Sequence, residues 1–196
     1  MAIYFRPLKY FHRGQNRPDG SIVKIRSRYT IPMRILGIDP GLRISGYGMV
    51  ALRPGQIDPS LVEAGIIKLN TKNTLSERLG QLHEELTALI KELKPDQLVV
   101  EKLYSHYKHP QTAILMGHAR GVILLCAQQV DIPVIDLPAT EVKKSITGYG
   151  HASKQQMQLA VQAQFNLPEP PQPPDVADAI GIALTHARRI AVQQLG

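Results

Sequence analysis

Cysteine and tryptophan are nearly missing from this sequence, which contains one cysteine, no tryptophan and few other aromatic residues. The single cysteine, Cys126, excludes an internal disulfide framework and any zinc site built mainly from cysteine, and it suits a reducing compartment. No apolar run is long enough to span a bilayer, and charged residues interrupt every early window that would serve as the apolar region of a signal peptide. We therefore expect a cytoplasmic protein with no membrane contact.

Positive charge is the most visible compositional bias, but it is unevenly distributed. The 196 residues carry a net charge of +7, a value typical of nucleic-acid-binding proteins. Residues 1–32 contain seven basic residues and one acidic residue, whereas residues 33–196 contain 16 basic and 15 acidic residues. Charge alone therefore does not establish a nucleic-acid partner. The length and the 43% hydrophobic content indicate a single domain of the α/β class.

The first 32 residues differ in pattern from the rest of the chain. They mix proline, glycine, arginine and asparagine with scattered aromatic residues, and they show neither helical nor strand periodicity. We interpret residues 1–32 as a basic N-terminal extension, expected to be flexible, and residues 33–196 as the folded domain.

From Met33 onward the hydrophobic pattern is regular. Leucines spaced by three and four predict an amphipathic helix over residues 75–93, which ends before Pro95. Strands first and then alternating helices and strands predict a mixed five-stranded sheet, an antiparallel meander followed by parallel strands, flanked by helices. The predicted strands are MRILGID (33–39), GYGMVAL (46–52), LVEAGIIKL (61–69), DQLVVEKL (96–103) and IPVIDL (132–137). The other predicted helices cover 111–130 and begin near Pro138, Ser153 and Asp175.

Two carboxylates stand where predicted strands end. Asp39 ends the first strand, and Glu101 follows the buried run QLVV. In sheets of this kind, ligands collect beyond the carboxyl ends of the parallel strands. The alternative is that each carboxylate caps a neighbouring turn, and beside Pro40 and Gly41 that alternative would be favoured for Asp39 alone. The second acid at a strand end favours a shared site.

Two further acids begin the last predicted helix. Asp175 and Asp178 are three residues apart, so their side chains lie on one helix face. The alternative is an N-cap followed by an acid that stabilises the helix dipole. An apolar strip that starts at Ala179 would pack this helix on the sheet and bring both aspartates beside Asp39 and Glu101. Four clustered carboxylates repel one another, and a pair of divalent cations such as Mg²⁺ would relieve that repulsion.

At this point a family resemblance becomes visible. The blocks ILGIDPGLRISGYG, VVEKLY, GHARGV, EVKKSITGYGHASKQQ and DVADAIGIALTH resemble, in order and spacing, those of the RuvC family of Holliday-junction resolvases in the RNase H-like superfamily. The match covers Met33 to about Arg189. The first block alone is also similar to the opening of actin-like ATPases and sugar kinases, whereas all the blocks together are specific to the resolvases.

The resemblance implies an RNase H-like nuclease domain over residues 33–196 and a function in DNA recombination and repair. It implies a four-way DNA junction as the substrate, a homodimer as the active form, and the RuvA–RuvB branch-migration complex as a partner. Two Mg²⁺ ions per active site are implied as the cofactor, with Mn²⁺ as a substitute. The four acids that match the family's metal ligands are Asp39, Glu101, Asp175 and Asp178, with Asp39 expected between the two ions.

Basic and aromatic residues near the acids also match the family. Lys143 and Lys154 match two lysines near the family's active site. Lys144 is an alternative to Lys143. For both matched lysines, the alternative role is simply to lie on a solvated helix face. Tyr104 matches an aromatic that meets unstacked junction bases, although the family more often has phenylalanine there, and Lys102 replaces the more familiar glutamine. The alternative role of Tyr104 is that of a half-buried aromatic at the rim of the site. The expected DNA contacts are Tyr104, Lys102, Lys108, Arg120 and Lys144.

Several alternatives stay open. An actin-like ATPase would need a second phosphate-binding hairpin and a second lobe, neither of which the sequence contains. A non-catalytic junction-binding module stays open because intact acids do not prove turnover. An RNase H-like nuclease that acts on RNA also stays open, although the long match to the resolvases disfavours it. The histidines, among them His106, His109 and His118, fit no common zinc spacing, and we assign none as ligands. The predicted helix 111–130 is apolar on more than one face, which is consistent with a subunit interface as well as core packing.

Overall fold

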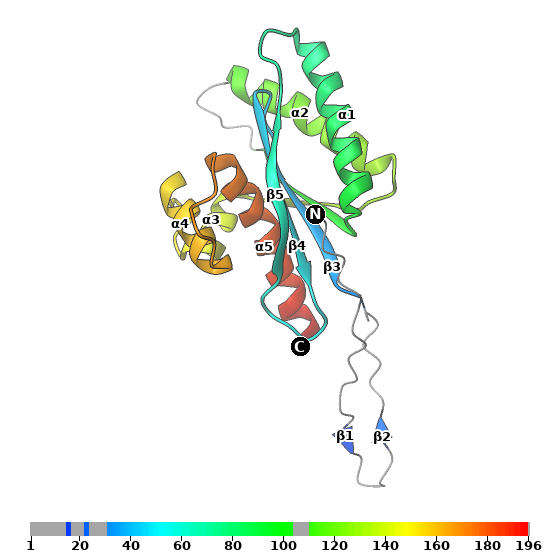
Figure 1. Ribbon diagram of the computed structural model, residues 1–196, viewed down its shortest axis with the longest axis vertical. Helices are drawn as coiled ribbons and strands as arrows, with labels where there is room; N and C mark the ends of the chain where they lie inside the picture. The colour runs from blue at the N-terminus through cyan, green and yellow to red at the C-terminus, as the bar shows by residue number, and fades with distance from the viewer. Residues whose placement is uncertain (1–14, 17–21, 24–30, 104–109, 196) are drawn as a thin grey trace.

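A computed structural model of the chain describes residues 15–16, 22–23, 31–103 and 110–195, and its centre is a five-stranded sheet in the order β5-β4-β3-β6-β7 (Figure 1). Its first three strands pair antiparallel and the last two run parallel to β3, so the predicted mixed sheet is confirmed. Within the N-terminal extension, β1 (Gln15–Asn16) pairs antiparallel with β2 (Ile22–Val23). The sheet strands are β3 (Met33–Asp39), β4 (Ile44–Leu52), β5 (Ser60–Lys68), β6 (Gln97–Glu101) and β7 (Val134–Leu137).

Helices cover both faces of the sheet. Alternating side chains divide the buried strands between two apolar clusters, with Leu36 and Ile38 on one face and Ile35 on the other. The first cluster includes side chains of α1 (Leu75–Leu93) and α2 (Pro110–Gln128). The second lies under α3, α4 and α5, which Figure 1 shows on the other side of the sheet. These three helices are α3 (Ala139–Thr147), α4 (Lys154–Phe165) and α5 (Pro174–Leu195).

Local signals explain where the predicted helix α1 starts and stops. The Thr74 hydroxyl accepts a hydrogen bond from the Glu77 N–H, and the Glu77 carboxylate accepts one from the Thr74 N–H, which is a complete capping box. The helix ends at Lys94, whose left-handed backbone precedes Pro95. Its apolar face is buried against the sheet and α2, where Cys126 is buried as well.

The first turn of the sheet is tighter than the sequence suggests. The predicted strands 33–39 and 46–52 leave residues 40–45 for the turn, whereas β4 already begins at Ile44. Ile44 and Ser45 extend β4 because they pair with β5 before pairing with β3 begins. The Ser45 hydroxyl also bonds the backbone of Gly41, accepting from its N–H at 3.0 Å and donating to its carbonyl at 2.7 Å. The Ser45 side chain therefore stabilises the turn that follows Asp39.

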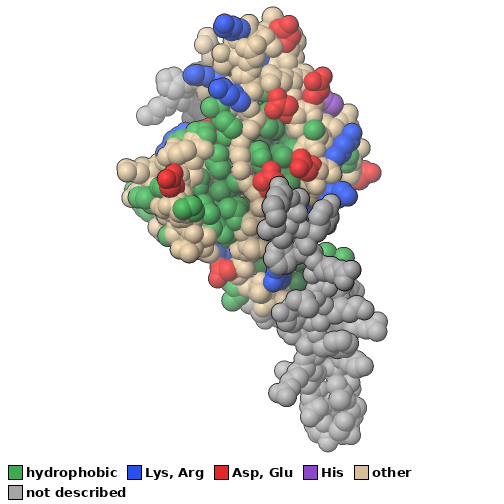
Figure 2. Space-filling model, in the orientation of Figure 1, with side chains coloured by type: hydrophobic (Ala, Val, Ile, Leu, Met, Phe, Trp, Pro, Cys, Tyr) green, Lys and Arg blue, Asp and Glu red, His purple; other side chains and the backbone are tan. Residues whose placement is uncertain are grey.

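Charged side chains of both signs are mixed on the face shown in Figure 2. This agrees with the near balance of basic and acidic residues after residue 32. No helix in the described part of the chain is long and apolar enough to cross a membrane.

Candidate active site

Adjacent strand ends bring the first two acids together. β3 and β6 are parallel neighbours whose last paired residues are Ile38 and Val100, and Asp39 and Glu101 follow directly. Both side chains are partly buried, and both stand at the carboxyl edge of the parallel strands. The predicted position of these two acids at one edge is confirmed.

Close contact between α5 and glycines of the sheet places Asp175 and Asp178 near Asp39. A Cβ on Gly46, the partner of Asp39 across the β3–β4 ladder, would collide with the backbone carbonyl of Asp175. Gly37 and Gly48 also lie against the α5 backbone further along the helix, where an added Cβ would collide with the Ala179 carbonyl and be 2.8 Å from the Ile180 Cα, respectively. The first turn of α5 therefore lies against the strand pair beside Asp39, because no side chain separates them.

The connector before α5 is also fixed in place. Gln158 is a buried polar residue of α4, and its side-chain amide donates a 2.8 Å hydrogen bond to the Pro171 carbonyl. The Gln162 amide reaches the carbonyls of Leu167 and Pro168 at 3.3 Å. These contacts hold the proline-rich segment 166–173 against α4, so they set where α5 begins.

One cavity of about 800 Å³ contains all six residues predicted to be catalytic. The structure thus brings together acids from three elements and lysines from two others, as the sequence analysis expected. They are Asp39 from β3, Glu101 from β6, Asp175 and Asp178 from α5, Lys143 from α3 and Lys154 from α4. Their catalytic roles stay predictions.

Burial and mutual repulsion make three of these acids hard to ionise. The pKa of Asp39 is raised well above its usual value, first by burial and then by the charges of Glu101, Asp178 and Asp175. Burial is also the main cause of the raised pKa of Glu101 and of Asp178. Lys154 acts in the opposite direction on all three, and Lys143 does so on Glu101 and Asp178. The site therefore has a deficit of positive charge.

The acids surround the cavity without yet forming a compact ligand set. In the described part of the chain, no three His, Cys, Asp or Glu side chains are already arranged to hold a metal ion. The electrostatic influence of Glu101, Asp175 and Asp178 on Asp39 nevertheless shows that their charges are close.

Of the neighbouring lysines, Lys143 and Lys154 line the cavity and Lys144 does not. Lys144 is exposed on α3. Lys154 is the first residue of α4, whose start is fixed by a capping box between Ser153 and Gln156. Of the two alternatives Lys143 and Lys144, Lys143 is therefore the one that lines the cavity, and its role in the reaction stays a prediction.

Two arginines on the α1 side of the cavity were not singled out from the sequence. Arg43 is exposed in the β3–β4 turn, and Arg78 comes from α1. A guanidinium nitrogen of Arg78 donates to the Leu42 carbonyl at 3.1 Å, while its Nε is buried without a partner. The position of Arg43 within the block GLRISGYG was an available signal, whereas Arg78 looked like any polar residue of an amphipathic helix.

Of the other residues predicted to contact DNA, Lys102 and Arg120 are not among those that line the cavity. Tyr104 and Lys108 lie outside the described residues. Lys102 has an exposed side chain, and its N–H donates to the Leu137 carbonyl at 2.8 Å. Arg120 forms an ion pair with Asp136 of β7. Contact of these residues with DNA stays a prediction.

Comparison with known proteins identifies the family. The model of the family described as crossover junction endodeoxyribonuclease RuvC matches residues 35–186, which is most of the chain. The chain belongs to the RuvC family. The family match includes all four acids, both cavity lysines and both cavity arginines. RuvC relatives with high similarity come from Rhodopirellula baltica, 48% identical over 76% of this chain and 83% of the relative, and Brevibacillus brevis, 43% identical over 80% and 92%.

Solved structures agree with this assignment. The chain is similar to the Thermus thermophilus RuvC structure determined in complex with a Holliday junction substrate, with a TM-score of 0.74 and 31% identity. That similarity covers 83% of this chain and 97% of the Thermus chain. The yeast mitochondrial Holliday junction resolvase Ydc2 shares the fold, with a TM-score of 0.55 at 17% identity. The RNase H-like resolvase fold expected from the sequence is therefore confirmed.

Proposed function

We propose that this chain is a structure-selective endonuclease that resolves Holliday junctions by paired, symmetric nicks in a four-way DNA junction. The observation that carries the proposal is the cavity in which four carboxylates face two lysines. Membership of the RuvC family supports the same activity, because its curated relatives are named crossover junction endodeoxyribonucleases. The Thermus relative was captured with a Holliday junction substrate, which supports DNA junctions over RNA.

The donor set of the cavity suits two Mg²⁺ ions, with Mn²⁺ as a substitute, because every candidate ligand is a carboxylate oxygen. Asp39, Glu101, Asp175 and Asp178 would hold the ions. Two such cations, when bound, activate a water molecule and stabilise the leaving 3′ oxygen of a phosphodiester. The raised pKa values of Asp39, Glu101 and Asp178 support this assignment, since added positive charge is what these acids lack.

The protein's own cations would hold the phosphate. Lys143 and Lys154 enter the cavity from the side of α3 and α4, and each carries positive charge without competing as a metal ligand. Their role is to bind the non-bridging oxygens of the scissile phosphate, where negative charge develops during attack. The products would carry 5′-phosphate and 3′-hydroxyl ends.

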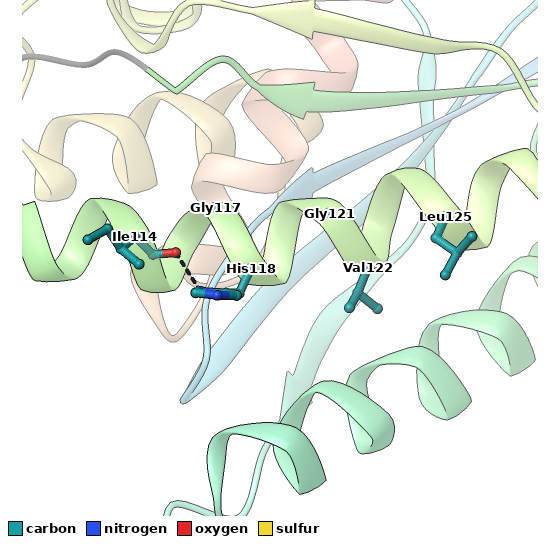
Figure 3. Close-up of a pocket in the computed structure, with 6 residues that line it drawn as sticks. All are labelled: Ile114, Gly117, His118, Gly121, Val122 and Leu125. Atoms are coloured by element: carbon teal, nitrogen blue, oxygen red, sulfur yellow. Dashed lines mark hydrogen bonds between the residues drawn. The ribbon is translucent and has the colours of Figure 1, made fainter.

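Two cuts in one junction call for two active sites, so we propose a homodimer with two-fold symmetry. The expected subunit interface is the apolar groove on α2 shown in Figure 3. Ile114, His118, Val122 and Leu125 project from one side of this helix, and Ile114 and Leu125 are 60% and 51% exposed. The His118 ring is turned back onto its own helix, 2.8 Å from the Ile114 carbonyl.

Two glycines in this groove support close approach of a second copy. Gly117 and Gly121 lie one helical turn apart, and a Cβ on either would meet no atom within 4 Å among the residues that the structure describes. Interior glycines each cost a helix about 1 kcal/mol relative to alanine. Nothing in the fold of one subunit requires that cost, whereas a partner helix packed against the groove would use the space.

The interface is tested by Leu125→Glu, with Val192→Glu as the matched control because Val192 is an exposed apolar residue of α5. Sedimentation should show a dimer for the wild-type protein and the control, and a monomer for Leu125→Glu. A Leu125→Glu protein that stays dimeric would move the interface elsewhere.

The function is tested with a synthetic mobile four-way junction and a duplex of matching sequence, each with and without Mg²⁺. Paired symmetric nicks in the junction alone, only with the cation, are the expected result. Binding without nicking would favour a non-catalytic junction-binding protein, and faster cleavage of RNA hairpins would favour an RNA nuclease. Either result would overturn the proposal.

The biological setting follows from the proposed substrate. Junctions that must be moved before they are cut suggest the RuvA–RuvB branch-migration complex as a partner, which co-purification from a mixture of the three proteins would test.

We also propose that residues 1–32 are dispensable for cleavage, because the family match begins at residue 35. Their basic charge should add general affinity for DNA, so deletion should reduce the salt dependence of binding without loss of selectivity.

A further inference from the structure

The loop between α3 and α4 presents an aromatic side chain to solvent. Tyr149 is 59% exposed, which makes it one of the most exposed large apolar side chains in the described part of the chain. Its ring packs against that of the exposed His151 in a T-shaped arrangement, with 5.7 Å between ring centroids and 66° between planes. Such a ring contributes little to core packing, because most of its apolar surface stays in water.

The loop that carries Tyr149 is built rigidly. Gly148, with a φ of 81°, ends α3 in the left-handed conformation, and its N–H donates to the Lys144 carbonyl. The Thr147 hydroxyl donates to the Lys143 carbonyl at 2.8 Å and accepts from the Tyr149 N–H at 3.2 Å. On the other side of Tyr149, the buried Ala152 donates its N–H to the Tyr149 carbonyl. The ring is therefore held out by a fixed backbone.

This loop returns to the rim of the active-site cavity. Gly150, which stands between the two aromatic residues, lies against the first turn of α3, where an added Cβ would be 3.1 Å from the Thr140 carbonyl. The preceding residue, Ala139, lines the cavity. Lys154, which begins α4 just after the loop, lines it as well. Tyr149 is thus flanked by two segments that reach the cavity.

We propose that Tyr149 stacks on an unpaired nucleobase of the cleaved strand beside the scissile phosphate, with His151 packed beside its ring. The inference rests on the proposed function, because it assumes that a DNA strand enters the cavity. Lys143 and Lys154 would bind the backbone phosphate, and a base on the same strand then lies within reach of the rim. An exposed aromatic beside cationic groups is the usual arrangement for binding single-stranded or unstacked nucleotides. Tyr149 acts as a selectivity residue, since stacking needs a base released from its duplex.

The experiment uses the full chain and a four-way junction that carries 2-aminopurine at successive positions around the crossover, with a chelator present to prevent cleavage. Binding of the wild-type protein should change the fluorescence at one of these positions. Tyr149→Ala should abolish that change and weaken junction affinity by about fivefold to 150-fold, the range expected for loss of one base stack. Tyr149→Phe should retain both properties, and the affinity for perfect duplex should not change.

Two control variants separate stacking from other roles. Ile57→Ala removes an apolar side chain of similar exposure, 53%, from the β4–β5 loop at the opposite end of the sheet, and should behave as wild type. Tyr149→Leu keeps apolar bulk but cannot stack, so full recovery of affinity by this variant would overturn the proposal. So would unchanged fluorescence and affinity in Tyr149→Ala. If the wild-type protein failed to cut junctions with Mg²⁺, the proposed function would fall, while the fluorescence would still decide whether Tyr149 stacks.

Discussion

Charged side chains have different surroundings at the two ends of the central sheet. At the end where β3 begins, charged side chains have partners: the Asp96 carboxylate accepts a 2.7 Å hydrogen bond from the Arg34 N–H, and Asp58 pairs with Arg188 at 3.5 Å. At the other end, Asp39 and Glu101 face further acids in a cavity, and their pKa values are raised. The first end uses charge to join distant segments, whereas the second holds acids that repel one another when they are ionised.

This difference distinguishes residues that stabilise the fold from residues that serve the site. A charge with a partner contributes a little to stability, and an exposed pair contributes about 0–1 kcal/mol. A buried cluster of like charges costs stability, so its presence needs a reason other than folding. The following substitutions test whether the two ends differ in this way.

The largest expected effect is loss of cleavage when a site acid is neutralised. Asp39→Asn, Glu101→Gln or Asp178→Asn should each abolish junction cleavage, because each removes a charge that the cations need while preserving shape. Junction binding should change little, since it depends on basic groups. Gel-shift and nicking assays with Mg²⁺ measure the two properties separately.

Asp58→Asn is the matched control from the opposite end and should cleave at the wild-type rate. A cleavage-competent Asp39→Asn protein would mean that Asp39 is only a turn residue. That result would remove the functional distinction between the two ends.

The next effect concerns the contact that brings α5 to the sheet. Gly46→Ala should lower the free energy of unfolding by roughly 1–3 kcal/mol, because the new methyl group collides with the Asp175 carbonyl. Cleavage should fall as well, since Asp175 must move. Gly80→Ala is the control: its Cβ would meet nothing, and alanine in the α1 interior should raise stability by about 0.5–1 kcal/mol. Chemical denaturation measures both, and equal effects would show that Gly46 does not position the helix.

A smaller effect is expected for the arginines on the α1 side of the cavity. Arg78→Gln should reduce junction cleavage about tenfold, the lower end of the loss expected for a hydrogen bond from a charged group, because it removes a cation and releases the Leu42 carbonyl. Arg43→Gln should have a milder effect, since Arg43 is exposed. Arg53→Gln, which removes an exposed arginine beyond the far end of β4, should leave the rate unchanged. Rates measured at several salt concentrations will show whether the loss reflects DNA contact.

The smallest effect is on the pH dependence of stability without metal ions. Raised carboxyl pKa values mean that the folded protein holds protons that the unfolded chain releases near pH 4. Stability should therefore fall as pH rises from about 4 through these raised values, and the melting temperature should be higher at pH 5 than at pH 7.5.

Burial lowers the pKa of His186, which acts in the opposite direction, so the informative quantity is the difference between wild type and Asp39→Asn. The variant should lose part of the gain in stability at acidic pH. Addition of Mg²⁺ at pH 7.5 should stabilise the wild-type protein more than the variant. Identical pH profiles for the two proteins would contradict the repulsion among the site acids.

The sequence predicts the site end of the sheet better than the opposite end, for a physical reason. Asp39 and Glu101 follow apolar strands, and Asp175 and Asp178 share a helix face, so local pattern and the rule for strand ends suffice to group them. The Asp58–Arg188 pair joins residues 130 positions apart, and no local pattern predicts such a contact. Arg78 was missed for a similar reason, because its place in the cavity depends on how α1 packs. The family resemblance, rather than periodicity, supplied Lys143 and Lys154.

The glycine contacts between β3, β4 and α5 have a consequence for protein engineering. Replacing glycine by alanine is a common route to higher stability, because it reduces the conformational freedom of the unfolded chain. At Gly37, Gly46 and Gly48 that route is closed, since α5 occupies the space of the missing side chains. A thermostable version of this nuclease should therefore be sought at solvent-facing glycines such as Gly80. Substitution of the three buried glycines should instead displace α5 with its aspartates and reduce activity.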